Sequence, residues 1–91
     1  MLQTISITIS GNVQGVFFRQ STREKAKELG ITGWVKNMPD RTVHILASGT
    51  KEHLEELVSW CRQGPPKASV HAVEVKERSL QQFDAFTIER S

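Results

Sequence analysis

The segment from Thr4 to Ser10 alternates polar and apolar side chains without a break, and all of its apolar residues are isoleucines. Successive side chains of a strand point to opposite faces of a sheet, so this pattern predicts a β-strand with one buried face. Isoleucine and threonine are β-branched and favour that conformation. A sheet with one apolar face must be covered, so the rest of the chain has to supply helices or a second sheet.

A helix is predicted after the loop that follows this strand. We expect it from about Gln20 to Leu29, where apolar and small side chains recur on one side. Ser21 and Glu24 have the spacing of a capping box at its start, and Gly30 provides a left-handed stop after it.

A second helix is predicted after Gly49, with Thr50 as its N-cap residue. Its apolar stripe consists of Leu54, Leu57, Val58 and Cys61. These positions follow the i, i+3, i+4, i+7 spacing of an amphipathic helix. The run Gly64-Pro65-Pro66 ends it.

The remaining ordered segments are predicted strands: Ile31–Met38, Thr42–Ser48, Val70–Val75 and the short Phe86–Ile88. The element order is therefore β-α-β-β-α-β, with a short extra strand at the end. Because crossovers are right-handed and the chain is small, we expect an α+β, ferredoxin-like split βαβ sandwich. In that arrangement two helices cover one face of an antiparallel sheet. The fold serves many unrelated activities and does not by itself predict one.

Composition restricts the class of protein. With 91 residues the chain is expected to form a single domain, residues 1–91, around one core. Cys61 is the only cysteine, which excludes an internal disulfide and a Cys-x-x-Cys metal site. There is no signal-peptide pattern and no membrane-length apolar run, so we expect a cytoplasmic protein without a membrane partner. The 12 basic residues are scattered and the net charge is only +2, which argues against a nucleic-acid partner.

The segment between the first strand and the first helix is a candidate binding site. Gly11 and Gly15 permit left-handed backbone, so successive N–H groups can point into one concavity beside a helix N-terminus. Between Ser10 and Arg23 the only ionisable side chain is Arg19. Amide donors with one guanidinium and no carboxylate suit a phosphate dianion. The same spacing also fits a tight connection whose arginine pairs with a surface acid, and it matches neither glycine-rich nucleotide motif.

A second candidate is the segment Gly33-Trp34-Val35-Lys36-Asn37. Gly33, Val35 and Asn37 share one face of the predicted strand, because side chains alternate along it. Asn37 falls at the strand end, where its amide can donate and accept hydrogen bonds. The alternative interpretation is an asparagine that only caps the backbone of the following turn.

Two motifs therefore stand in order along the chain, Gly11-x-Val13-Gln14-Gly15-Val16-x-Phe18-Arg19 and Gly33-Trp34-Val35-Lys36-Asn37, followed by Val43 and Gly49. Together they resemble the two signature segments of the acylphosphatase family. The Gly64-Pro65-Pro66 break and the Phe86-Thr87-Ile88 ending also fit, so the resemblance covers nearly the whole chain. It implies a ferredoxin-like fold and hydrolysis of small acyl phosphates to a carboxylate and inorganic phosphate, without a metal or other cofactor.

By motif position, the resemblance implies that Arg19 and Asn37 are the catalytic residues. Arg19 would bind the phosphate together with the backbone N–H groups of Gln14, Gly15, Val16, Phe17 and Phe18. Asn37 would orient the attacking water. Because the leaving group of an acyl phosphate is a carboxylate, a pocket without an acid or a histidine can be sufficient.

Two positions depart from the family pattern. Arg41 stands where a turn glycine is usual, so we expect the turn after Asn37 to differ or to be strained. His44 stands where an acid is common. Neither lies in the motifs, so these departures concern the turn and the edge of the site more than the reaction.

Two other function classes stay open. One is a non-catalytic anion-binding or regulatory domain that uses the same loop. The other is an RNA-binding module, since the RNA-recognition motif has the same element order, although the predicted strand Thr42–Ser48 lacks the aromatic residues on which bases stack. The physiological acyl phosphate is not identified by the residues, and a monomer is expected.

Overall fold

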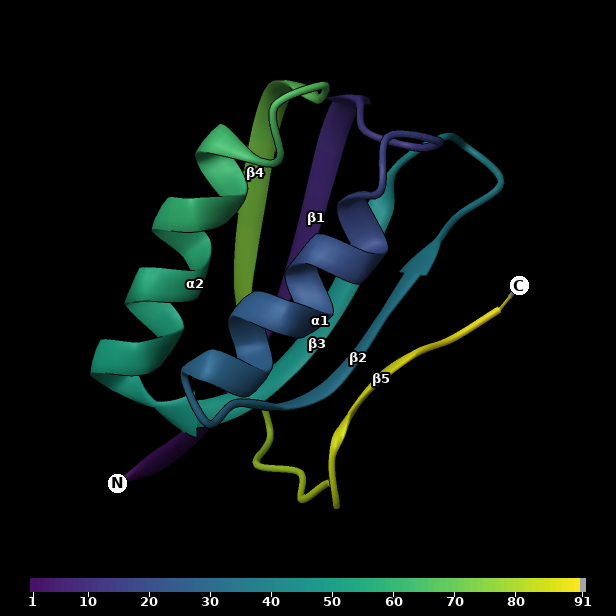
Figure 1. The fold of residues 1–91 in the computed structure, drawn as a ribbon. Coiled ribbons are helices and arrows are strands. Elements are labelled where there is room, and N and C mark those ends of the chain that lie inside the picture. The colour runs from purple at the N-terminus through teal and green to yellow at the C-terminus, as the bar shows by residue number, and fades with distance from the viewer. Residues whose placement is uncertain (91) are drawn as a thin grey trace.

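The computed structural model describes residues 1–90, which form one sheet with two helices packed on a single face (Figure 1). The elements in chain order are β1 (Leu2–Asn12), α1 (Phe18–Glu28), β2 (Thr32–Asn37), β3 (Val43–Thr50), α2 (Lys51–Gln63), β4 (Ser69–Arg78) and β5 (Phe86–Ile88). The predicted element order is confirmed, including the short final strand. No helix in this part of the chain is long and apolar enough to cross a membrane.

The five strands lie in the order β4-β1-β3-β2-β5. β1 pairs antiparallel with β3 and β4, and β2 pairs antiparallel with β3, which confirms the ferredoxin-like arrangement. β5 pairs in parallel with β2, so the prediction of an antiparallel sheet is wrong at this edge. The reason is topological: β4 lies on the opposite edge, and the chain crosses the end of the sheet and returns in the direction of β2 (Figure 1).

The connection from β4 to β5 is fastened to the sheet through Gln81. Its backbone N–H donates to Thr4 Oγ1 at 2.9 Å, and its carbonyl accepts from Ser48 Oγ at 2.8 Å. Thr4 and Ser48 are themselves hydrogen-bonded at 2.6 Å and both are buried. These bonds satisfy polar groups that burial would otherwise leave unpaired, and they direct the chain toward the β2 edge.

The core lies between the sheet and the helices. The alternating isoleucines of β1 all face it, as the sequence pattern predicts. The helices contribute the buried residues Phe18, Thr22, Ala26, Leu54, Leu57 and Cys61. Val58, predicted on the same stripe, is only half-buried. Burial raises the pKa of the Cys61 thiol to about 12, so this cysteine is an inert part of the core.

Both helix N-termini were predicted to carry side-chain caps, and only one does. Thr50 accepts a hydrogen bond from the backbone N–H of His53, so the predicted cap of α2 is confirmed. α1 begins at Phe18, two positions before the predicted start, and Ser21 lies inside it, so the predicted capping box is wrong. At its N-cap stands Phe17, which has a left-handed backbone and makes no side-chain capping bond. The left-handed stop at Gly30 is confirmed, with φ at 71°.

Candidate active site

The loop between β1 and α1 is held at both ends by buried apolar side chains. Val13 is 1% exposed and Phe18 is 2% exposed, so each end is anchored in the core. Between them the backbone is left-handed at Gly15, with φ at 74°, and at Phe17, with φ at 63°. Because Phe17 has a Cβ, its left-handed backbone is strained, and its side chain is 72% exposed.

The backbone N–H groups of residues 14–18 are the chemical feature of this loop. Within the described residues, none of them donates a hydrogen bond to a backbone carbonyl. They stand at the N-terminus of α1, where the helix dipole adds partial positive charge. α1 also has no acidic residue in its first turn that would compete for them. This arrangement of free donors is suited to an anion.

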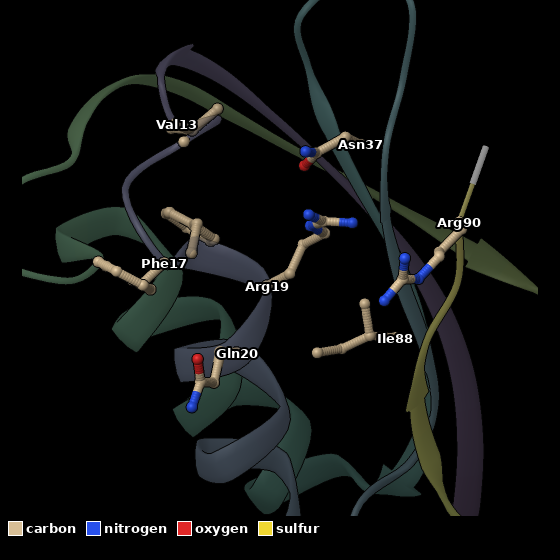
Figure 2. Close-up of a pocket in the computed structure, with 9 residues that line it drawn as sticks. Val13, Phe17, Arg19, Gln20, Asn37, Ile88 and Arg90 are labelled. Carbon is tan, nitrogen blue, oxygen red and sulfur yellow. The ribbon is translucent and has the colours of Figure 1, made fainter.

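Beside the loop lies a cavity of about 420 Å³. The residues that line it are Val13, Gly15, Phe17, Phe18, Arg19, Gln20, Asn37, Ile88 and Arg90. Figure 2 shows Arg19 pointing from the first turn of α1 toward Asn37, with Val13 and Phe17 on one side and Ile88 and Arg90 on the other. The structure thus brings together the two residues that the motifs single out, from segments separated in sequence.

Asn37 is the last residue of β2 and faces the cavity. Gly33 and Val35 are buried on the same face, as the predicted alternation requires, while Lys36 lies on the other face against the Trp34 ring. The Asn37 Oδ1 atom is buried and has no hydrogen-bond partner among residues 1–90. The side chain therefore does not cap the following turn through this oxygen. A buried acceptor without a partner is uncommon in folded proteins and is a feature of functional sites.

Gln14 is predicted to supply a backbone donor, and its side chain has a separate structural role. Its Nε2 donates to the carbonyls of Met38 and Thr42, both at 2.9 Å. These bonds fasten the loop to the turn between β2 and β3. Gln14 itself does not line the cavity with Arg19, and neither does Val16, whose side chain packs against the core.

The β2–β3 turn is left-handed at Arg41, with φ at 75°. The turn therefore keeps the backbone for which a glycine would be usual, and Arg41 carries the expected strain. Asp40 Oδ1 accepts hydrogen bonds from the backbone N–H and the hydroxyl of Thr42. Those donors favour the ionised carboxylate and lower the pKa of Asp40.

Ile88 and Arg90 are lining residues that the sequence did not single out. β5 pairs with β2 in parallel, with Ile88 opposite Val35, and this register carries Arg90 to the level of Asn37. The available signal was the alternation of Phe86, Ile88 and Arg90 on one face of the last strand. It could not be used without knowing which strand β5 joins.

The cavity offers charge and hydrogen bonds but no side chain that is acidic, imidazole or thiol. In the described part of the chain, no group of three such residues is placed to hold a metal ion. The cavity lining provides the guanidinium groups of Arg19 and Arg90, the amide side chains of Asn37 and Gln20, and the adjacent loop donors. Groups of this kind can bind an anion and position a neutral molecule beside it.

A sequence model of the family named Acylphosphatase matches residues 5–88. An acylphosphatase of Acaryochloris marina is 49% identical over 86 residues, which are 94% of this chain and 92% of the relative. The structure of an acylphosphatase from Coxiella burnetii matches with a TM-score of 0.94 at 41% identity, covering 97% of this chain and 93% of that one. An acylphosphatase from Bacillus subtilis matches with a TM-score of 0.92 at 38% identity, covering 98% and 99%. The chain therefore belongs to the acylphosphatase family.

Proposed function

We propose that this protein hydrolyses the carboxyl-phosphate bond of small acyl phosphates, without a metal, to a carboxylate and inorganic phosphate. Family membership supports the reaction class. The observation that carries the mechanism is the juxtaposition of a set of free loop donors and Arg19 with Asn37 across one cavity. The loop donors and Arg19 can bind a phosphate, and Asn37 can hold a water molecule beside it.

The phosphoryl group is bound by charge and by amide donors. Arg19 and the N–H groups of residues 14–18 contact its non-bridging oxygens, where negative charge is spread in the transition state. Because these donors are already oriented, little reorganisation is needed when the charge redistributes. Removing one donor of this kind costs about 3–4 kcal/mol of transition-state stabilisation in other enzymes.

Asn37 positions the nucleophile. Its Oδ1 accepts a hydrogen bond from a water, and the water oxygen attacks phosphorus in line with the leaving carboxylate. The bond between phosphorus and the acyl oxygen breaks, and the carboxylate leaves with the electron pair. The water proton passes to a non-bridging phosphoryl oxygen, so no protein base is needed, in agreement with a cavity lining free of acids and histidine.

The finer properties of the protein are also part of this proposal. We infer a single-domain monomer of the cytoplasm that acts on a small molecule and has no nucleic-acid partner. Scattered basic residues and a net charge of +2 support the last point. Size-exclusion chromatography with light scattering tests the monomer, and a mass of two chains would contradict it.

The experiment for the proposed function measures acetyl phosphate hydrolysis in excess EDTA for the wild type and the Asn37→Ala variant. We expect full activity of the wild type and a fall in kcat of about 10²-fold or more in the variant. The inhibition constant of inorganic phosphate should change less than threefold, because Asn37 serves the water rather than the phosphate. Gln63→Ala, which removes an exposed amide from α2, is the matched control and should change nothing.

Arg19→Ala is the complementary variant and should lose both turnover and phosphate inhibition. A wild-type protein that binds phosphate and does not turn over acetyl phosphate would contradict the proposal and favour a regulatory anion-binding domain. A requirement for a divalent metal would contradict the mechanism. An equal loss of phosphate affinity and kcat in Asn37→Ala would contradict the role of Asn37.

A further inference from the structure

Arg90 brings a second guanidinium to the cavity, beyond the one that the proposed mechanism uses. Ile88 and Arg90 both line the cavity, on the side that lies across from Val13 and Phe17 (Figure 2). Figure 2 also shows the Arg90 side chain reaching inward from the chain that follows β5, with its guanidinium on the side of the cavity where Ile88 lies.

The position of Arg90 follows from the backbone of its edge strand. The N–H of Glu89 donates to the Val35 carbonyl at 2.8 Å, which continues the pairing with β2 one residue beyond β5. The side chain of Glu89 accepts a hydrogen bond from the Thr87 hydroxyl at 3.0 Å. Side chains alternate along a strand, so Thr87 and Glu89 face away from the helices while Ile88 and Arg90 face the cavity.

Arg90 forms no ion pair with any of residues 1–90. Within residues 1–90, the one ion pair formed joins Lys25 to Glu28 on α1. The nearest acid along the chain, Glu89, is held on the opposite face by Thr87. Among the described residues, the cavity lining has no carboxylate either, so Arg19 and Arg90 both add positive charge to it.

A phosphoryl group seated on the loop would leave Arg90 facing the rest of the substrate. Arg19 projects from α1 beside the loop donors, whereas Arg90 comes from the other wall, next to Ile88 (Figure 2). Ile88 is half-buried and can contact a short aliphatic chain, and Arg90 lies at the end of that apolar surface. An apolar surface that ends in a guanidinium fits a short chain that ends in a carboxylate.

We propose that Arg90 is a specificity residue that binds a second carboxylate on the acyl part, so that the preferred substrates are monoacyl phosphates of short dicarboxylic acids. This inference rests on the proposed function and adds the substrate class to it. Arg90 is exposed, so solvent screens its charge and the preference is moderate. It should also decrease as salt is added.

The test compares three substrates at low ionic strength: acetyl phosphate, butyryl phosphate and succinyl phosphate. Butyryl phosphate has about the size of succinyl phosphate without its second charge. In Arg90→Gln we expect KM for succinyl phosphate to rise about three- to tenfold with kcat unchanged, as for the loss of a contact made equally in ground and transition states. Both constants for the other two substrates should stay within twofold.

Two further variants separate recognition from general effects. Arg62→Gln removes an exposed arginine on α2 and should leave all three substrates unchanged, which controls for net charge. Arg90→Lys keeps the charge and should recover part of the succinyl phosphate affinity. At 0.5 M salt, the difference between wild type and Arg90→Gln should shrink.

The possible results are distinct. A selective rise in KM for succinyl phosphate supports the inference. An equal loss for all three substrates overturns it, because Arg90 would then serve the phosphoryl group or the fold. No change for any substrate also overturns it and leaves the proposed function intact. A wild-type protein that hydrolyses none of the three overturns the proposed function and this inference with it.

Discussion

The β1–α1 loop and the β2–β3 turn both hold a non-glycine residue in the left-handed region, Phe17 in the loop and Arg41 in the turn. They differ in what happens to their hydrogen-bonding groups. In the turn, Met38 N–H donates to the Thr42 carbonyl, Arg41 N–H donates to the Met38 carbonyl, and Thr42 N–H donates to Asp40. In the loop, the N–H groups of residues 14–18 donate to no backbone carbonyl within the described chain.

Backbone strain is therefore compatible with two different roles. In the turn it is balanced by local hydrogen bonds, and changes there should alter stability. In the loop the strain accompanies N–H donors that have no backbone acceptor within residues 1–90, and changes there should alter binding and turnover. The Gln14 side chain links the two regions through its hydrogen bonds to the turn. A change at Gln14 should therefore alter both stability and activity.

Among changes that test this comparison, the largest effect is expected for Gln14→Glu, which replaces the donor to Met38 and Thr42 with an acceptor. Two carbonyls lose a donor, and a negative charge enters a loop suited to an anion. We expect kcat/KM to fall about 10²-fold, the cost of roughly 1 Å of misplacement. The free energy of unfolding should fall by about 2 kcal/mol. Gln82→Glu makes the same chemical change at an exposed site and should affect neither.

Gly15→Ala tests the loop by backbone strain alone. A Cβ at Gly15 would meet no atom within 4 Å, and φ is +74°. The unbonded loop should shift to relieve the strain, so we expect kcat/KM to fall about tenfold, with stability changed by about 1 kcal/mol or less. Gly30→Ala is the matched control, with φ at +71° and equally open space, but it stands at the end of α1. The Gly30→Ala variant should lose a similar amount of stability and keep full activity. If Gly30→Ala lowered kcat/KM and Gly15→Ala did not, the loop would not have the special role in activity that we assign to it.

Arg41→Gly tests the turn in the reverse direction. Glycine adopts the left-handed region freely, so its gain in the folded state should exceed its entropic cost in the unfolded chain. We expect the free energy of unfolding, measured in denaturant, to rise by up to about 1 kcal/mol while kcat/KM stays within twofold. Phe17→Gly relieves the same backbone strain in the loop but makes the loop more flexible, so it should lower kcat/KM. A drop in activity for Arg41→Gly would mean that the strained turn also shapes the site.

The smallest effect is expected from the acid titration of Asp40. The pKa of this carboxyl is lowered from 3.8 by the hydroxyl and the N–H of Thr42. A pKa lowered in the folded state adds stability above the unfolded value, and this part is lost as the pH falls through the folded one. Asp40→Asn should therefore flatten the decrease in stability below about pH 4, as followed by denaturant unfolding between pH 5 and pH 2. Asp84→Asn, at an exposed carboxylate that accepts no hydrogen bond within residues 1–90, should keep the wild-type slope.

Side-chain periodicity was sufficient to predict the element order and most of the core. The alternating isoleucines of β1 and the helical spacing of Leu54, Leu57 and Cys61 each require one buried face, so they predict the layers directly. The start of α1 could not be predicted in this way. A left-handed Phe17 sets it through the backbone, and a phenylalanine is not a signal for that conformation.

The candidate site was predictable to the extent that its residues lie in contiguous motifs. Arg19 and Asn37 could be named because each closes a recognisable segment. Arg90 could not, because its place depends on β5 joining β2 in parallel, a pairing between strands far apart in the chain. The hydrogen bonds from the Gln14 side chain to the β2–β3 turn could not be predicted from the sequence for the same reason. Long-range register is a property of the assembled sheet and leaves little local pattern.

The buried Oδ1 of Asn37 has a consequence for which molecules can occupy the cavity. A buried acceptor that loses every donor costs about 1–3 kcal/mol, and native proteins have only about 5–15 kcal/mol in total. A molecule that covers this oxygen must therefore either donate a hydrogen bond to it or leave a donating water in place. Of two cavity ligands of equal size, the one that donates to Oδ1 should bind more tightly and raise the melting temperature more.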